Sequence, residues 1–255
     1  MSDVAWTGTP VRPHPGARDN GAESLPWGGR RERLPLAWPF AEAVQGYRDK
    51  ALANPDFDPA ATFVWGQMMA VGLIEALKAV EERFGGEGHD VVRGALRRAG
   101  DRILAEMTEG VEVPEDATPA EIASLIASWI NEVCYASIEA PRVENEGANF
   151  DIHYCPHEDV YGAFDCRVQR YYVEGMIDAA RRHFGSMFDV RFTSTIPAGS
   201  HTCHFDMFPA DGCRADEWNE YSDALRGKAL KVIDVSADRD ERPNDPDERP
   251  NDPSS

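Results

Sequence analysis

The hydrophobic pattern predicts that the first half of the folded body is helical. Apolar residues recur at helical spacing over 58–85, behind the start signal Asp58-Pro59, until a pair of glycines interrupts them. A second helical pattern covers 90–107. A third begins at the capping box Thr118-Pro119-Ala120-Glu121 and continues to about residue 138. We therefore expect three consecutive helices ahead of the first strand.

The pattern changes to strand-like alternation near residue 150. Strands are predicted over 150–155, 188–196 and 201–208, and the last two form a hairpin around a four-residue turn. A fourth helix is predicted over 162–184, between the first two strands, and a short helix over 214–226 follows the hairpin. The expected fold class is α+β, with a helical N-terminal half packed on a small antiparallel sheet and one crossover helix.

Composition divides the chain into three parts. Residues 1–57 are rich in proline and glycine and predict an extended N-terminal arm, whose aromatic residues favour docking on the body or contacts within a homo-oligomer. Residues 58–228 form the predicted α+β catalytic domain. Residues 229–255 contain a tandem repeat of seven polar residues, which cannot bury a core, so we expect a disordered acidic tail.

Net charge and cysteine content limit the classes of partner and the cellular compartment that we expect for this protein. The formal net charge of −19 over 255 residues repels phosphate backbones and anionic lipids, so neither nucleic acid nor a membrane is an expected partner. The longest apolar run, Met68 to Leu77, is also short for a membrane span. Five cysteines are an odd number and no secretory signal is visible, so we expect a cytoplasmic protein with reduced thiols.

Candidate chemistry concentrates in two clusters of cysteine and histidine. These are His153-Tyr154-Cys155-Pro156-His157 and residues 201–206, and Cys166 lies between them near a predicted helix start. The positive end of a helix can lower the pKa of a nearby thiol, so Cys166 is a candidate thiolate. The candidate catalytic residues are Cys155, Cys166, Cys203, His157, His204 and Asp206.

Three interpretations of these clusters stay open. In the first, one thiolate is a nucleophile that a nearby histidine activates, with Asp206 or Glu158 orienting the imidazole. In the second, a divalent metal is held by His153, Cys155, His201 and Cys203, although the Cys-x-x-Cys spacing of structural zinc sites is absent. In the third, the cysteines are small buried hydrophobic residues. No cofactor is expected, and the metal stays an alternative.

The order of the motifs is itself informative. The run from Cys155-Pro156 through Cys166 and Phe184-Gly185 continues with residues 192–199 and closes on Cys203-His204-Phe205. Over roughly residues 60–209 the chain thereby resembles the L-2-amino-thiazoline-4-carboxylic acid hydrolase family. The resemblance implies a helical half followed by a small α/β part. It also implies hydrolytic opening of a cyclic amidine or thiazoline, with C–S cleavage to a carbamoyl-cysteine-like product, in some relatives within secondary-metabolite pathways.

The resemblance and the clusters lead to one hypothesis with two alternatives. The three cysteines border a pocket for a small-molecule substrate, and one thiolate attacks or hydrogen-bonds at an electrophilic amidine carbon. His157 or His204 serves as general acid–base, and Asp206 orients an imidazole. The alternatives are a biosynthetic enzyme that forms or rearranges a related ring, and a non-catalytic protein that binds a metal or small ligand with the same cluster.

Overall fold

The fold is an α+β arrangement of helices on a four-stranded sheet. The computed structural model describes residues 34–135, 142–144, 147–185, 188–209 and 217–240. In chain order the elements are α2 (Ala41–Tyr47), the π-helical turn η1 (Arg48–Leu52), α3 (Ala60–Thr108), α4 (Pro119–Tyr135), β1 (Arg142–Glu144), β2 (Gly147–Ile152), α5 (Arg167–Phe184), β3 (Phe188–Ser194), the 3₁₀ turn η2 (Ile196–Ala198), β4 (Cys203–Pro209) and α6 (Glu217–Asp240). The predicted fold class is therefore confirmed.

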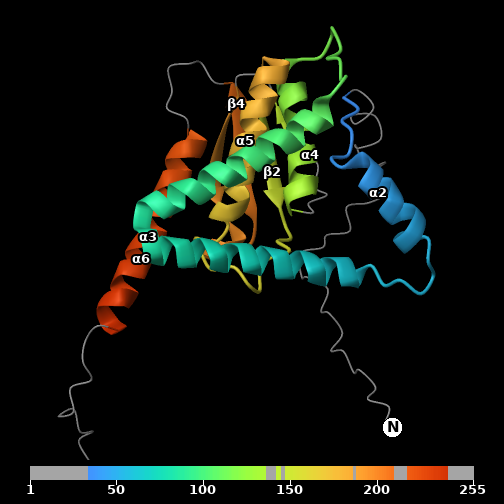
Figure 1. The fold of residues 1–255 in the computed structure, drawn as a ribbon. Coiled ribbons are helices and arrows are strands. Elements are labelled where there is room, and N and C mark those ends of the chain that lie inside the picture. Colours follow the sequence, from blue (N-terminus) through green and yellow to red (C-terminus); the bar gives the residue numbers. More distant parts are fainter. Residues whose placement is uncertain (1–33, 136–141, 145–146, 186–187, 210–216, 241–255) are drawn as a thin grey trace, which may run out of the picture.

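The sheet has the strand order β1-β2-β4-β3, and every neighbouring pair is antiparallel. Because β4 lies between β2 and β3, α5 is a crossover helix that joins two non-adjacent strands. Figure 1 shows α4 and α5 lying along the sheet, and α6 lies beside the edge strand β3. The predicted hairpin of β3 and β4 is present, with η2 in its connection.

Period-two alternation places the core on one face of the sheet. Phe150 of β2 pairs with Phe205 of β4, and their rings stack with centroids 4.9 Å apart. Val190 of β3 pairs with Met207 of β4 on the same buried face. The apolar side of α4, centred on Ile126 and its neighbours, packs against these side chains. One hydrophobic core therefore joins α4, α5 and the sheet.

Helices α3 and α5 approach each other so closely that their backbones touch. A Cβ atom added at Gly100 of α3 would lie 1.9 Å from the carbonyl oxygen of Tyr172. A Cβ at Gly175 of α5 would lie 1.8 Å from the carbonyl oxygen of Arg97. Real Cβ atoms do not tolerate such distances, so only glycine fits at both positions.

A bend at Gly85 divides α3 into two arms. Gly85 has φ 57° and ψ −141°, a backbone conformation that side chains disfavour, and Figure 1 shows the two arms meeting at a sharp bend beside α6. Four residues to either side, Glu81 and His89 are fully buried and share a 2.6 Å hydrogen bond. The Arg167 guanidinium bonds the same carboxylate at 2.7 Å. Burial alone would raise the pKa of Glu81, but these hydrogen bonds outweigh it and lower that pKa.

The helix starts and stops that the sequence predicts are largely present. The backbone N–H of Glu121 donates to Thr118 Oγ1 at 3.2 Å, as a capping box requires, and Gly185 closes α5 with φ 61°. The two helices predicted over 58–85 and 90–107 are the two arms of α3. The strand predicted over 150–155 ends at residue 152; residues 153–155 lie outside the sheet, and a turn begins at Pro156.

Helical structure also extends beyond the predicted domain boundaries. α2 and η1 lie within residues 1–57, which were expected to form an extended arm, and α6 continues through residue 240, past the expected start of the tail at 229. The remainder of both terminal segments, including the tandem repeat, lies outside the described residues. The division into arm, domain and tail otherwise stays a prediction.

Among the described residues, α3 is one helix whose length and composition would suffice to cross a membrane. Only 17% of its most apolar 18-residue window is buried. Core helices of other proteins pass the same test, so the finding is weak on its own. The expectation of no membrane partner, which rested on the net charge of −19 and on the short run from Met68 to Leu77, stays a prediction.

The backbone contact between α3 and α5 predicts the effect of a single methyl group. Gly175→Ala should lower the free energy of unfolding by more than about 3 kcal/mol, because two helices must separate to admit the new Cβ. Gly227→Ala in α6 is the matched control, since no atom lies within 4 Å of its Cβ position. Chemical denaturation of both variants measures the difference. Equal midpoints for the two variants would show that α3 and α5 are not packed this closely.

Candidate active site

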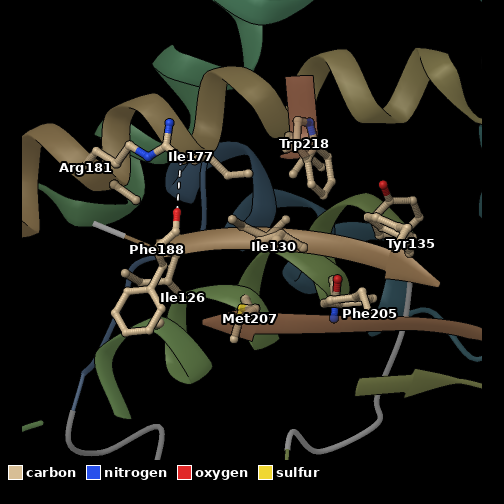
Figure 2. A pocket seen from close by; sticks show the side chains of 16 residues that line it. Ile126, Ile130, Tyr135, Ile177, Arg181, Phe188, Phe205, Met207 and Trp218 are labelled. Atoms are coloured by element: carbon tan, nitrogen blue, oxygen red, sulfur yellow. Dashed lines mark hydrogen bonds between the residues drawn. The ribbon is translucent and has the colours of Figure 1, made fainter. Parts of the chain in front are cut away.

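A cavity of about 70 Å³ lies between the sheet and the helices α4, α5 and α6. On a scale where one water needs roughly 10–15 Å³, it has room for several water-sized groups. Figure 2 shows Tyr135 and Trp218 at one end of the cavity and Phe188 and Ile126 at the other. Almost all of its lining is apolar, so a ligand here would need an apolar body.

Two buried donors line this cavity without a hydrogen-bond partner among the described residues. They are Asn131 Nδ2 and Trp218 Nε1, and each side chain is 4% exposed. A buried N–H with no acceptor costs about 1–3 kcal/mol, so such groups call for an explanation. An acceptor atom of a bound molecule would satisfy them.

A buried arginine stands behind the Tyr135 end of the cavity. The guanidinium carbon of Arg170 lies 4.6 Å from the ring centroid of Phe192, 4.1 Å from that of Trp218 and 4.5 Å from that of Tyr221. Phe192 and Trp218 also line the cavity, so the ring cage and the cavity share a wall. The described hydrogen bonds of Arg170 go to neutral oxygens, to Ser222 Oγ at 3.3 Å and to the carbonyl of Trp218 at 3.1 Å.

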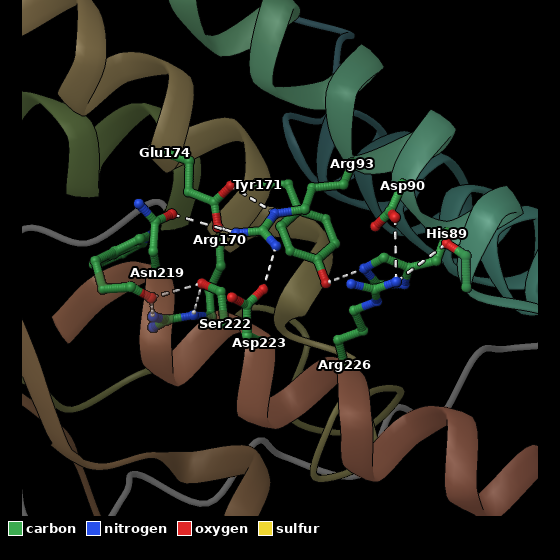
Figure 3. A network of polar contacts seen from close by, with 12 residues as sticks. His89, Asp90, Arg93, Arg170, Tyr171, Glu174, Asn219, Ser222, Asp223 and Arg226 are labelled. Atoms are coloured by element: carbon green, nitrogen blue, oxygen red, sulfur yellow. Dashed lines mark hydrogen bonds and ion pairs between the residues drawn. The ribbon is translucent and has the colours of Figure 1, made fainter. Parts of the chain in front are cut away.

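The surroundings of Arg170 differ from those of its neighbours in charge. Figure 3 shows Arg93 held by the carboxylates of Glu174 and Asp223, whereas among the described residues no carboxylate is hydrogen-bonded to Arg170. Burial lowers the pKa of Arg170. Tyr135 and Cys166 would oppose that effect only in their ionised forms, whereas the nearby carboxylate of Glu174 opposes it without a hydrogen bond to Arg170. The site therefore contains a buried positive charge that is not neutralised by a hydrogen-bonded acid.

Two candidate thiols lie near this arginine. Cys166 immediately precedes α5, one helical turn before Arg170. Cys203 begins β4 and its sulfur accepts a 3.2 Å hydrogen bond from the backbone N–H of Ile196. Burial raises the pKa of Tyr221, and negative charge on Cys166 or Cys203 would raise it further. Both thiols are thus within electrostatic range of the same ring, although Cys203 packs against one core cluster and Cys166 against the other.

The protonation state of Cys166 differs from the prediction. Its position at the start of α5 was expected to favour the thiolate, but burial raises the pKa of this thiol to about 11. The Arg170 guanidinium lowers the pKa without overcoming the loss of hydration. Cys166 is therefore a neutral thiol at physiological pH.

His157 and Cys155 form the adjoining part of the site. The imidazole of His157 stacks on Tyr161 with centroids 4.6 Å apart, and its Nδ1 lies 3.1 Å from Gln67 Oε1. Gln67 Nε2 donates to the carbonyl oxygen of Pro156, which turns its Oε1 toward the histidine, so Nδ1 carries the proton. Burial lowers the pKa of His157 and raises that of Cys155. His157 is consequently neutral, with Nε2 as its basic nitrogen.

Cys155 connects this histidine with Cys166. The backbone N–H of His157 hydrogen-bonds the Cys155 sulfur, and Cys155 in turn raises the pKa of Cys166. The nearby Gln169 amide donates to the Tyr161 hydroxyl at 2.8 Å, while its own oxygen is buried without a partner among the described residues. We refer to Cys155, Cys166, Cys203, His157 and Arg170, with the rings around them, as the thiol site.

The other two predicted catalytic residues lie on the opposite face of the sheet. Strand alternation turns His204 and Asp206 away from Cys203, so neither reaches the thiols, which corrects the expectation that they act there. His204 Nδ1 is 2.7 Å from Asp151 Oδ1, and its Nε2 is 3.4 Å from Asp206 Oδ1. Asp206 therefore does contact an imidazole, but Asp151, which the sequence did not single out, is the nearer acid.

The alternative metal set is not assembled. Among the described residues, no group of three or more histidine, cysteine, aspartate or glutamate side chains is placed to hold a metal ion. His153 and His201 are exposed, while Cys155 and Cys203 are partly buried. These four residues therefore do not converge in the way the second interpretation requires.

Several residues of the site escaped sequence reasoning. Arg170, Tyr135, Trp218 and Tyr221 sit on three different helices, and no local motif links them. One signal was available: Cys166 and Arg170 lie four positions apart and continue the apolar face of α5, where a charged residue is out of place.

Comparison with known proteins shows the family of the chain. The sequence pattern of the L-2-amino-thiazoline-4-carboxylic acid hydrolase family matches residues 65–207, more than half of the chain. The chain belongs to that family. An uncharacterized protein of Archaeoglobus fulgidus (strain ATCC 49558 / DSM 4304 / JCM 9628 / NBRC 100126 / VC-16) is 41% identical over 202 residues, which cover 76% of this chain and 89% of the relative.

The family match covers most of the thiol site and omits one wall of it. Cys155, Cys166, Arg170 and Cys203 fall within residues 65–207, whereas α6 lies beyond them. The rings of Trp218 and Tyr221, which contact Arg170, therefore lie outside the region that the family pattern matches.

The raised thiol pKa predicts how Cys166 responds to pH. Alkylation by iodoacetamide, read by peptide mass spectrometry, should accelerate roughly tenfold per pH unit from neutral pH upward without levelling off below about pH 10, because the thiolate alone reacts. Free cysteine in the same solution is the control, and its rate should level off above its ordinary pKa near 8.5. Arg170→Met should slow Cys166 further, since it removes the charge that favours the thiolate. If the alkylation rate of Cys166 did not change with pH above neutrality, burial would not be raising the pKa of this thiol.

Proposed function

We propose that this hydrolase-family member opens a small cyclic amidine of the thiazoline-carboxylate type at the thiol site. The family name supports a hydrolase acting on such a ring. The observation that carries the proposal is Arg170, which is buried without a hydrogen-bonded carboxylate and lies one turn from Cys166. A substrate carboxylate would neutralise that charge, and the apolar cavity next to it suits a small ring.

The proposed reaction consumes one water. The oxygen of water bonds to the amidine carbon between the ring nitrogen and the ring sulfur, the C–S bond breaks, and the sulfur leaves as a thiol. The oxygen becomes the carbonyl of a carbamoyl group on the nitrogen, and the protons of water end on nitrogen or sulfur. Neutral His157 has a basic nitrogen that can accept the proton of the attacking water.

The thiols take a role that suits their protonated state. A neutral thiol cannot be the attacking nucleophile, but it can donate a hydrogen bond or a proton to the departing sulfur. In this proposal Cys166 is that donor, and Cys203 borders the ring. Thiolate attack on the amidine carbon, the form of the hypothesis that the sequence favours, requires prior loss of the Cys166 proton against its raised pKa.

Turnover of L-2-amino-thiazoline-4-carboxylic acid tests the proposal. The purified chain should convert this compound to a product heavier by one water, which mass spectrometry detects. Cys166→Ala should lower kcat by about 10²–10⁴-fold, the range for loss of a positioned acid. Cys134→Ala is the matched control, because that thiol contacts the Met176 sulfur in the core between α4 and α5. Burial raises the pKa of Cys134 to about 12, so it is a second neutral thiol.

Two outcomes would overturn this proposal. Absence of turnover at high enzyme concentration excludes this compound as the substrate, and binding without turnover would favour the non-catalytic alternative. Equal activity of the Cys166 and Cys134 variants would remove thiol chemistry from the mechanism.

The role of Arg170 has a test of its own. Arg170→Met should raise KM for the carboxylate substrate by about 10–100-fold, since a hydrogen bond to a charged group contributes about 1.5–3 kcal/mol. For 2-amino-2-thiazoline, which lacks the carboxylate, the same change should have little effect, and Arg170→Lys should restore part of the loss. Similar losses for both compounds would assign Arg170 a structural role in its ring cage.

A further inference from the structure

The first arm of α3, residues 60–84, exposes large apolar side chains to solvent. We call it the α3 limb. The exposed fractions are 49% for Phe63, 56% for Val64, 62% for Trp65, 61% for Met68, 51% for Met69 and 37% for Val71. In Figure 1 the limb runs across the lower part of the molecule, beneath the sheet and α5. An exposed apolar patch of this extent on one helix marks an interaction surface.

The opposite side of the same limb is already buried. Ile74 and Leu77, 2% and 0% exposed, pack into a core cluster with Tyr171, and Gln67 bonds the loop that carries His157. A helix on the surface of a globular protein is normally apolar on one side and polar on the other. The α3 limb is apolar on both sides, and its outer side is exposed with no partner among the residues that the structure describes.

A lipid bilayer is a poor occupant of this face. Residues 60–74 contain no charged side chain, but these fifteen residues span only about 22 Å of helix, less than the ~30 Å hydrocarbon core of a membrane. The limb is also attached to the body along its inner side. The net charge of −19 would repel anionic lipid surfaces.

No contact with the described residues requires a glycine at position 72 on the outer face. Helical spacing places Gly72 beside Met68, Met69 and Trp65, and no atom lies within 4 Å of the position its Cβ would take. Glycine inside a helix costs about 1 kcal/mol relative to alanine. A residue without a side chain at this point leaves room for a second helix to approach.

We propose that the outer face of the α3 limb pairs with the same face of a second copy of this chain about a two-fold axis. An isologous contact brings identical surfaces together, and an uncharged stretch is where two strongly acidic chains can meet without repulsion. The half-exposed side chains leave on the order of 500 Å² of apolar surface per copy, most of the ~800 Å² per partner of a stable interface.

Sedimentation equilibrium of the full chain tests the dimer. The wild-type protein should have twice the 28.3 kDa chain mass at micromolar concentration. Met68→Glu should produce a monomer, whereas Val91→Glu should leave the dimer intact, because Val91 is an equally exposed apolar residue, 71% exposed, on the second arm of α3. Gly72→Leu should weaken dimerisation at least tenfold without lowering the unfolding midpoint of the monomer, since leucine favours the helix and its side chain meets a neighbour only in the pair.

Three results would overturn the proposal. A wild-type protein that stays monomeric at about 100 μM, far above the dissociation constants of specific dimers, excludes the pairing. A dimer that persists in Met68→Glu would lie on another surface, such as the arm of residues 1–57. Binding of a monomeric wild type to phosphatidylcholine vesicles, lost in Met68→Glu, would assign the face to lipid.

Discussion

The thiol site depends on how tightly α5 is held against α3. At Gly100 and Gly175 the two backbones are in contact, and no side chain can stand between them. About two turns nearer the start of α5, the buried carboxylate of Glu81 binds Arg167, the first residue of that helix. The start of the helix is therefore fixed in position and in rotation, and Cys166, which immediately precedes it, takes its place from that constraint. A small displacement between α3 and α5 would move the thiol and the arginine together.

The same region shows why Arg170 stands apart from the other arginines of α5. Arg167 is neutralised by Glu81, and Arg181 lies near Asp189, each within the ion-pair distance of its partner. Arg170 is 2% exposed and is surrounded by three rings and two neutral oxygens. Cation–π contacts stabilise a desolvated guanidinium by about 2 kcal/mol, which is less than the several kcal/mol that burial of an ion costs. The rest of the fold must compensate for that deficit in stability.

The sequence predicts local structure well here because its signals are local. The capping box at Thr118, the closing Gly185 and the alternation in β4 all act within a few residues, and each is present. Strand alternation places Cys203 and His204 on opposite faces of the sheet, as the structure has them. Grouping them as catalytic partners considered only their chemical types. The cage around Arg170 joins residues from α5, β3 and α6, which no spacing rule connects. Desolvation of Cys166 likewise depends on neighbours distant in sequence, so the helix-end argument mispredicts its protonation state.

One helix connects the chemistry of the site with the surface of the molecule. Gln67 on the inner side of the α3 limb holds His157 by its Nδ1 proton, which leaves Nε2 as the base. Trp65 and Met68, its neighbours in sequence, lie on the outer side with about six-tenths of their surface exposed. Burial of that outer side would add hydrophobic stabilisation of about 25 cal/mol per Å², and a limb held on both sides moves less than one held on one. The orientation of the histidine thus depends on a helix that packs against the rest of the described chain on its inner side alone.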